Sequence, residues 1–245
     1  MGQASSRDIR VVILAGGKGA RLRPLTAVFP KPLVPLGNKP ILEILLRRLT
    51  SFGFTDVTLC TGYLSELLMA VFGDGAKLGL NIRYVREETP LGTAGALAMV
   101  DDLTDPFLVM NGDLLTTLDF NKMLQHHRAR QADITVGTFR RDVRIDFGVI
   151  ESDQQGRFLR CREKPTYHFE VSMGVNVLRR RVAERIEPNK PLDMPDLIES
   201  VHASGGTVCC YREDCQWLDI GRMDDYALAQ EQYAQNEQMF LGTTS

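Results

Sequence analysis

The first half of this chain alternates short apolar runs with amphipathic segments, and this alternation constrains the fold more than any other feature. The apolar runs predict strands at 11–14, 57–61, 82–86, 107–111 and 134–139. Apolar residues at helical spacing predict helices between them at 40–52, 65–72, 93–100 and 120–130, the last capped by Asp119. This order predicts an α/β fold with a doubly wound, mainly parallel, Rossmann-like sheet and helices on both faces.

The alternation changes after residue 139. Strand patterns follow at 148–152, 157–163, 171–178 and 207–211, with a short helix from 193 to 205 and a C-terminal helix at 224–238. No repeat, low-complexity stretch or Pro/Ser-rich linker separates the two halves. We therefore expect one domain over 1–245: a nucleotide-binding half at about 10–139, an added substrate-binding β region at about 140–228, and a C-terminal helix and tail at 229–245.

Net charge argues against nucleic acid as the main partner, because 29 Lys and Arg face 31 Asp and Glu. Between residues 7 and 31, however, six basic residues face one acidic residue, a local excess of +5. The basic residues are Arg7, Arg10, Lys18, Arg21, Arg23 and Lys31. This local charge favours a small anionic ligand.

Several features bear on location. No apolar run approaches the roughly 20 residues that a membrane-spanning helix needs, and the first residues lack the apolar core of a secretory signal. The five cysteines are an odd number without metal-site spacing, which favours reduced thiols and a cytoplasmic protein. Gly2 and Ser6 match a myristoylation pattern, and lipidation is left open.

Three glycines follow the first predicted strand: Gly16, Gly17 and Gly19. Without side chains, such a loop lets backbone N–H groups approach phosphate oxygens. Leu22 stands where a dinucleotide fingerprint needs its third glycine, and the Gly-Lys-Ser/Thr of a P-loop is absent. Phosphate binding is favoured over a plain tight turn, because Arg21 and the other nearby basic residues accompany the glycines.

The glycine loop resembles the signature of the sugar-1-phosphate nucleotidyltransferases, also called NDP-sugar pyrophosphorylases. The matching segment is L-A-G-G-K-G-A-R-L-R-P-L-T at 14–26, followed by P-K-P at 30–32. Further family motifs follow in order: P-L-G-T-A-G at 90–95, N-G-D at 111–113, F-G at 147–148, E-K-P at 163–165 and W-L-D-I-G at 217–221. The resemblance covers about residues 10 to 228. It departs at Ala20, where the family usually has Thr or Ser, so one hydroxyl contact to the triphosphate is in doubt.

The resemblance implies an enzyme in which a sugar-1-phosphate oxygen attacks the α-phosphorus of an NTP and expels pyrophosphate. It implies two catalytic residues, Arg21 on the triphosphate and Lys31 at the α-phosphate, although Lys31 could also be a solvated lysine. The implied nucleotide-binding residues are Leu14, Ala15, Gly16, Gly17, Gly19, Glu87, Gly92, Thr93, Asn111 and Gly112.

The resemblance also implies a metal and a sugar site. Asp113 and Asp219 would hold Mg²⁺, a hard ion that prefers carboxylates, waters and phosphate oxygens. Either carboxylate could instead be structural. The implied residues for the sugar phosphate are Gly148, Glu163, Lys164 and Asn176, which makes 140–228 the sugar-binding half. A surface ion pair is the alternative for Glu163 and Lys164.

Glu87 indicates the base. A carboxylate accepts hydrogen bonds only, and guanine offers adjacent donors at N1 and N2, whereas thymidylyl and uridylyl relatives commonly carry Gln here. We therefore expect GTP to be the preferred nucleotide. The alternative is that Glu87 is a solvated charge at a strand end and does not contact the base. The chain looks most like short guanylyltransferases that activate amino-sugar or heptose 1-phosphates for surface glycans.

Three alternatives stay open. They are a thymidylyl- or uridylyltransferase acting on glucose 1-phosphate or a related sugar, a phosphocholine-type cytidylyltransferase, and a non-catalytic subunit that binds nucleotide sugars. Neither the sugar nor the oligomeric state follows from the sequence, so a homo-oligomer is also left open.

Overall fold

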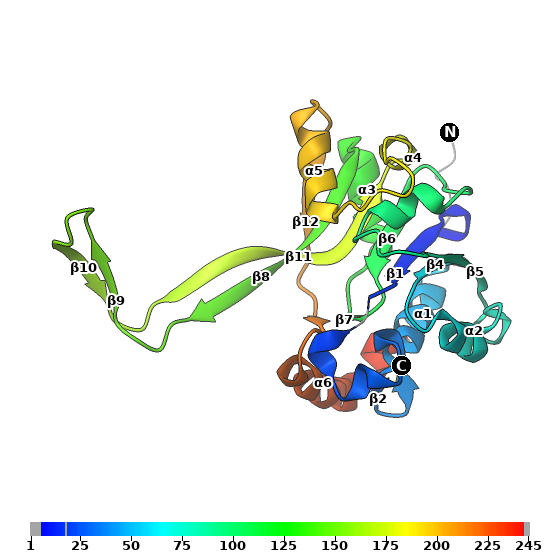
Figure 1. Ribbon diagram of the computed structural model, residues 1–245, viewed down its shortest axis with the longest axis horizontal. Coiled ribbons are helices and arrows are strands. Elements are labelled where there is room, and N and C mark those ends of the chain that lie inside the picture. The colour runs from blue at the N-terminus through cyan, green and yellow to red at the C-terminus, as the bar shows by residue number, and fades with distance from the viewer. Residues whose placement is uncertain (1–5, 18, 243–245) are drawn as a thin grey trace.

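Seven strands form the central sheet of the computed structural model, which describes residues 6–17 and 19–242 (Figure 1). In sheet order they are β12 (Val208–Arg212), β8 (Ile134–Arg144), β11 (Thr166–Leu178), β6 (Phe107–Asn111), β1 (Val11–Ala15), β4 (Asp56–Thr61) and β5 (Asn81–Arg86). β11 runs antiparallel to both of its neighbours, and all other neighbouring pairs are parallel. The predicted doubly wound, mainly parallel α/β sheet is confirmed.

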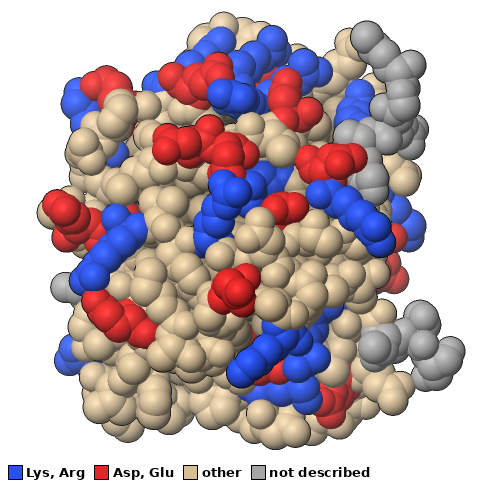
Figure 2. Space-filling view, turned by 90° about the vertical axis from the view of Figure 1, so that its right-hand side faces the viewer, with Lys and Arg blue, Asp and Glu red and all other residues tan. Residues whose placement is uncertain are grey.

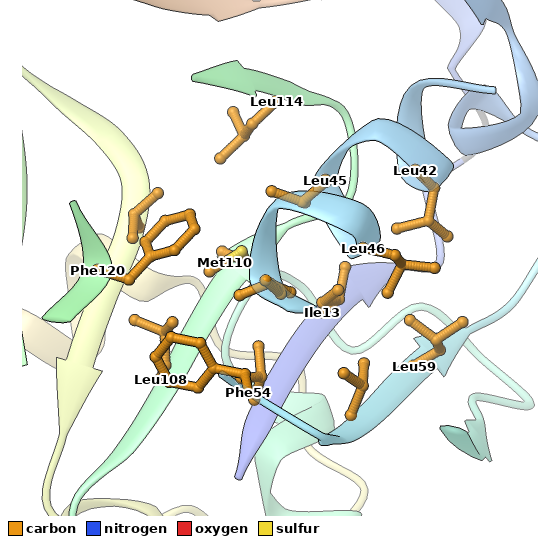
Figure 3. Packing of buried hydrophobic residues seen from close by; sticks show 14 of the residues in the cluster. Ile13, Leu42, Leu45, Leu46, Phe54, Leu59, Leu108, Met110, Leu114 and Phe120 are labelled. Carbon is orange, nitrogen blue, oxygen red and sulfur yellow. The ribbon is translucent and has the colours of Figure 1, made fainter. Parts of the chain in front are cut away.

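Helices cover both faces of this sheet. One face packs against α1 (Ile41–Ser51), α2 (Ser65–Phe72) and α3 (Phe120–Arg130). The other packs against a 3₁₀ turn at Gly95–Met99, α4 (Arg180–Ala183) and α5 (Met194–Ala203). Figure 3 shows the first core, where Leu42, Leu45 and Leu46 of α1 lie over Ile13 and Leu59. None of the helices among the described residues is long and apolar enough to cross a membrane.

The predicted α-helix at 93–100 is wrong, because this segment forms only the 3₁₀ turn Gly95–Met99. Its start is held by tertiary hydrogen bonds: the N–H groups of Ala94 and Gly95 both donate to the Leu192 carbonyl, at 2.9 and 3.1 Å. These bonds join the start of the turn to the segment that precedes α5. The cap predicted for α3 is present, since Asp119 accepts from the Lys122 N–H at 3.0 Å.

The C-terminal helix α6 (Met223–Leu241) packs on α1 through a third apolar cluster. The buried Arg48 of α1 ties the two together, because its guanidinium donates to the carbonyls of Met239 and Leu118 at 2.8 and 2.9 Å. The guanidinium also lies over the Phe52 ring, 5.0 Å from its centroid. Burial lowers the pKa of Arg48 to about 10, so the group remains protonated at neutral pH.

Replacing Arg48 by methionine is expected to lower the free energy of unfolding by about 2–3 kcal/mol, because the buried carbonyl of Leu118 and the partly buried carbonyl of Met239 lose a charged donor. Urea denaturation followed by circular dichroism measures this. Arg47→Met is the matched control on the same helix, since Arg47 makes only an exposed pair with Glu43 and should cost at most about 0.5 kcal/mol. Equal losses in the two variants would contradict this role for Arg48.

Strands β8 and β11 continue past the sheet as a two-stranded ribbon that projects from the molecule (Figure 1). Its outer end carries the small hairpin β9 (Val149–Ser152) and β10 (Phe158–Arg162). We call residues 139–171 the arm. The sequence predicts the four strands involved, but β8 extends beyond residue 139 and β11 begins before residue 171, because charged residues obscure the apolar alternation there.

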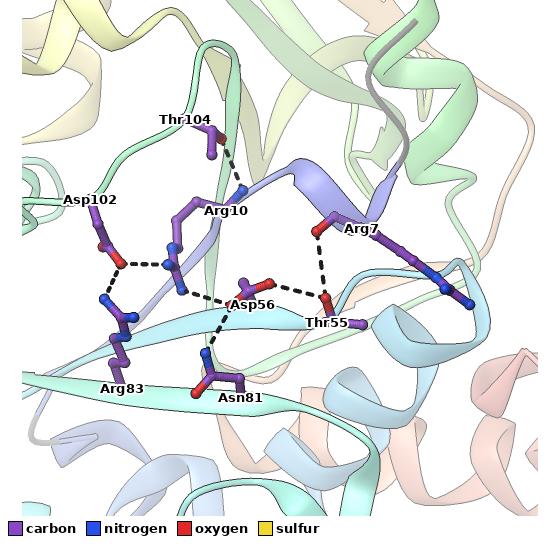
Figure 4. Close-up of polar contacts among 8 residues, drawn as sticks. All are labelled: Arg7, Arg10, Thr55, Asp56, Asn81, Arg83, Asp102 and Thr104. Atoms are coloured by element: carbon purple, nitrogen blue, oxygen red, sulfur yellow. Dashed lines mark hydrogen bonds and ion pairs between the residues drawn. The ribbon is translucent and has the colours of Figure 1, made fainter.

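Charged residues at the amino edge of the sheet form a structural cluster (Figure 4). Arg10 pairs with Asp102 and lies 3.7 Å from Asp56, and Arg83 shares Asp102. The cluster lies at the start of β1, whereas the glycine loop follows its end. Arg7 and Arg10 therefore do not contribute to the positive charge near that loop. On the face turned away from the arm, basic and acidic side chains are interspersed (Figure 2).

Candidate active site

The glycine loop follows β1 at the carboxyl edge of the sheet, where ligands of α/β proteins bind. Gly19 has a φ of +60°, and a Cβ there would lie 3.0 Å from both Lys31 Cβ and Thr26 Cγ2. Its carbonyl accepts a hydrogen bond from the Thr26 hydroxyl at 2.7 Å. The loop thus packs directly on the segment that carries Lys31, and only glycine fits this close approach.

A cavity of about 430 Å³ lies against this loop. Every residue that the resemblance assigns to the nucleotide lines it, together with Arg21, Lys31 and Asp113. These nucleotide residues are Leu14, Ala15, Gly16, Gly17, Gly19, Glu87, Gly92, Thr93, Asn111 and Gly112. Segments far apart in sequence therefore meet in one place.

Lys31 lies between the two carboxylates predicted to hold a metal. Its ammonium forms an ion pair with Asp113 and is 3.7 Å from Asp219 Oδ1. Asp219 reaches this position because β13 (Trp217–Asp219) pairs antiparallel with β7 (Leu114–Thr116), which begins directly after Asp113. The Lys31 side chain is only 12% exposed, which strengthens its interaction with both charges.

The surroundings of the carboxylate pair make the charged form of Asp219 less favourable. Burial and the nearby Asp113 raise the pKa of Asp219, although Lys31 and Arg21 oppose the shift. The second oxygen of Asp113, Oδ1, is buried without a hydrogen-bond partner among the described residues. Two converging carboxylates with a free oxygen fit a divalent cation such as Mg²⁺, which completes its coordination with phosphate and water.

A second cavity, of about 670 Å³, adjoins the first and shares Leu14, Thr93 and Asn111 with it. Asn176 lines it, is 3% exposed, and has an Oδ1 without a hydrogen-bond partner among the described residues. Three carboxylates also line the cavity, those of Asp193, Glu199 and Asp219. Among the described residues around this cavity there is no Lys, Arg or His.

The other three residues predicted for the sugar phosphate lie elsewhere. Gly148, Glu163 and Lys164 are exposed at the outer end of the arm and line neither cavity. They are close to one another: a Cβ at Gly148 would lie 3.2 Å from Glu163 Oε2, and Lys164 Nζ is 3.9 Å from Glu163 Oε1. Within one subunit, the structure brings only Asn176 to the second cavity.

Glu87 lines both the first cavity and a further cavity of about 990 Å³. Its Oε2 accepts from the Leu91 N–H at 3.0 Å, while a Cβ at Gly16 would lie 2.6 Å from its Oε1. Burial raises the pKa of Glu87, and the bond from Leu91 opposes the shift. Gly62 and Tyr63, which also line this larger cavity, were missed from the sequence. They directly follow β4, so the rule that ligands bind where parallel strands end would have found them.

Asp193, also missed, fixes the loop that carries Gly92 and Thr93. Its Oδ1 accepts from the Thr93 N–H at 3.0 Å, and the Thr93 hydroxyl accepts from the Met194 N–H at 2.8 Å. Gly92 has a φ of +76°, and a Cβ there would lie 2.5 Å from the Leu192 carbonyl oxygen. Since Thr93 lines both cavities, these contacts hold the wall between them.

A mainly parallel sheet with a cavity at its carboxyl edge, lined by glycines and by Arg and Lys side chains, is an arrangement in which α/β proteins bind phosphorylated ligands. The nucleotidyl transferase family model matches residues 10–236. The chain therefore belongs to the nucleotidyl transferase family, and the family resemblance stated from its motifs is confirmed.

Two curated relatives illustrate the range of the family. The chain is 35% identical over 229 residues to a mannose-1-phosphate guanylyltransferase of Mycobacterium tuberculosis, covering 91% of this chain and 64% of the relative. It is 31% identical over 238 residues to a UTP–glucose-1-phosphate uridylyltransferase of Synechocystis, covering 89% and 61%. The chain thus spans somewhat less than two thirds of the length of these relatives.

Solved structures support the fold. HddC from Yersinia pseudotuberculosis, complexed with GMP-PN, matches with a TM-score of 0.71 at 23% identity, covering 92% of this chain and 99% of that one. A putative glucose-1-phosphate thymidylyltransferase from Bacillus anthracis, in complex with a sucrose, matches with a TM-score of 0.73 at 22% identity, covering 91% and 94%.

Proposed function

We propose that this chain transfers a nucleotidyl group from an NTP to a sugar 1-phosphate, giving an NDP-sugar and pyrophosphate. The observation that carries the proposal is the meeting of the glycine loop, Lys31 and the Asp113–Asp219 pair beside a second cavity with polar lining. The names of the curated relatives, which pair a nucleotide with a sugar 1-phosphate, support it.

The chemistry requires positioning and charge neutralisation more than a protein nucleophile. Backbone N–H groups of the glycine loop and the Arg21 guanidinium bind the triphosphate in the first cavity. The sugar phosphate lies in the second cavity. One of its oxygens faces the α-phosphorus where the two cavities adjoin. Lys31 stabilises the negative charge that develops at the α-phosphate oxygens. Asp113 and Asp219 would hold Mg²⁺, which supplies further charge neutralisation when bound.

GTP is the nucleotide that we propose. Glu87 is half-buried in the nucleotide cavity, and its oxygens can accept from the N1–H and N2–H of guanine. Several curated relatives are guanylyltransferases, which supports this assignment. A uridylyl- or thymidylyltransferase is the second candidate, since the Synechocystis relative is named for UTP.

Replacing Glu87 by glutamine is expected to relax the nucleotide preference. Against thymine or uracil the carboxylate meets a carbonyl oxygen, a mismatch of about 1–3 kcal/mol, or roughly tenfold to a hundredfold in kcat/KM. The variant should therefore gain activity with dTTP or UTP relative to GTP by that factor. The measurement is kcat/KM for each NTP with one sugar 1-phosphate.

Glu88→Gln is the matched control, because Glu88 is an exposed neighbour that lines only the larger cavity. It should leave the ratio unchanged. Wild-type kcat/KM values that favour dTTP or UTP would contradict the role of Glu87 and favour the second candidate.

The proposed activity is tested by pyrophosphate release from the four common NTPs against a panel of sugar 1-phosphates. We expect release with GTP and at least one hexose, amino-sugar or heptose 1-phosphate, and the corresponding NDP-sugar as product. Absence of release with every pair would overturn the proposal.

All five cysteines are free thiols, which supports a cytoplasmic location for the reaction.

A further inference from the structure

The arm has one mainly apolar face and one charged face. Side chains alternate along its two paired strands, so cross-strand partners share a face. The mainly apolar face carries Phe139, Val143, Tyr167, Phe169 and Val171, together with Arg141 opposite Phe169, and the charged face carries Arg140, Asp142, His168 and Glu170. Phe169 is 53% exposed and Val143 is 37% exposed, so the described part of the subunit leaves much of this face uncovered. A two-stranded ribbon is marginally stable alone in water, which makes an uncovered apolar face a site for a partner.

The outer end of the arm does not reach the second cavity of its own subunit. Ser172 lines that cavity, and β11 extends from it outward to Thr166, a distance of about 20 Å at about 3.3 Å per residue. Lys164 lies beyond Thr166. The ladder between β8 and β11 is continuous from the pair Thr166–Arg144 to the pair Ser172–Thr138. The ladder keeps this part of the arm extended, away from the cavity, up to the register shift between Ser172 and Asn176.

The second cavity lacks positively charged side chains among its described lining residues, and the arm carries such side chains. A sugar 1-phosphate would bring negative charge to a cavity whose charged lining residues, among those described, are the carboxylates of Asp193, Glu199 and Asp219. The nearby Lys31 is already engaged by Asp113 and Asp219. The outer end of the arm presents Arg160 and Lys164, both exposed. Although Glu163 lies 3.9 Å from Lys164, these two cations are the kind of side chain that the second cavity lacks for an anionic ligand.

We propose that the arm acts in trans: two copies of this chain pair through the apolar faces of their arms, and each arm brings Lys164 and Glu163 to the second cavity of the other copy. This inference rests on the proposed function. Lys164 then binds the sugar phosphate, and Glu163 accepts hydrogen bonds from sugar hydroxyls. A two-fold dimer would cover the exposed apolar side chains of each arm and supply a cation to each second cavity. In such a dimer both copies use the same surface, and each arm reaches the cavity of the other copy.

The test is complementation between two impaired variants, assayed at a sugar 1-phosphate concentration well below the KM of Lys164→Ala. Asp113→Asn impairs the nucleotide cavity but keeps the arm, whereas Lys164→Ala impairs the arm but keeps the cavities. The two chains are co-expressed with different tags, and the dimers are purified together and assayed for pyrophosphate release. Random pairing makes half of the dimers mixed, each with one complete site of two, so activity should recover to about a quarter of the wild-type value. Activity no higher than the mean of the two parents, or wild-type kinetics in Lys164→Ala alone, would overturn the proposal.

The oligomeric state gives a readout that does not depend on the reaction. Sedimentation should show that the wild-type chain is a dimer and that Phe169→Arg is a monomer. His168→Arg, which places the same residue on the charged face, should remain a dimer. A monomeric wild type, or a dimeric Phe169→Arg, overturns the trans arrangement. Wild-type protein that dimerises in this way but releases no pyrophosphate counts against the proposed function and not against the role of the arm in pairing.

Discussion

Replacing Asp113 by asparagine is expected to reduce kcat about 10²–10³-fold, because the variant removes a charge that both orients Lys31 and would hold Mg²⁺. Asparagine keeps the size and shape of the side chain, so the packing around it should survive. The effect should appear in kcat, since the contacts of Asp113 matter most when charge develops at the α-phosphate. Steady-state kinetics with GTP and a sugar 1-phosphate measure it.

Asp101→Asn provides the control, because Asp101 is an exposed acid outside all the cavities described above. It should have wild-type kinetics. Circular dichroism and the thermal midpoint should be close to those of the wild type in both variants. An Asp113→Asn protein with unchanged kcat would remove this residue from the mechanism and with it the proposed metal site.

Replacing Lys31 by alanine is expected to lower kcat by a similar factor, about 10²–10³-fold, with a smaller change in KM for either substrate. Lys31 is held between Asp113 and Asp219 and lines the nucleotide cavity, so its charge is positioned before the reaction begins. Such a contact contributes most when negative charge grows on the reacting phosphate. The separation of kcat from KM distinguishes it from Lys164→Ala, which should mainly raise KM for the sugar phosphate.

Lys77→Ala serves as the control for this variant, because Lys77 is exposed and lies outside the described cavities. It should leave both constants unchanged. If Lys31→Ala raised KM for the NTP without lowering kcat, Lys31 would bind the ground state and would not stabilise the transition state.

Most of the fold and the nucleotide cavity could be predicted from local sequence. Strands such as 57–61 and 107–111 are apolar runs buried on both faces, and their ends determine where polar residues collect. Glycines at 16, 17 and 19 directly after a strand specify a loop that approaches a ligand. These signals are local, so one sequence suffices to interpret them.

What could not be predicted depends on contacts between distant segments. The segment expected as an α-helix at 93–100 is a 3₁₀ turn, and its start is tied to a distant segment through the Leu192 carbonyl. Asp193 has no local signal for its role, which is to accept from Thr93. The arm was missed because alternation of charged and apolar residues predicts a strand but does not say whether a sheet covers it.

The pairing of β13 with β7 implies that the two carboxylates of the site come together late in folding. Asp219, near the C-terminal end of the chain, lies beside Asp113 through this long-range pairing. Contacts between residues distant in sequence form late, because the intervening chain must first be ordered. The glycine loop and the first strands can therefore become native while the carboxylate pair is still separate. If the proposed function holds, regain of activity on refolding then marks the joining of β13 to β7, and not the formation of the first strands and the glycine loop.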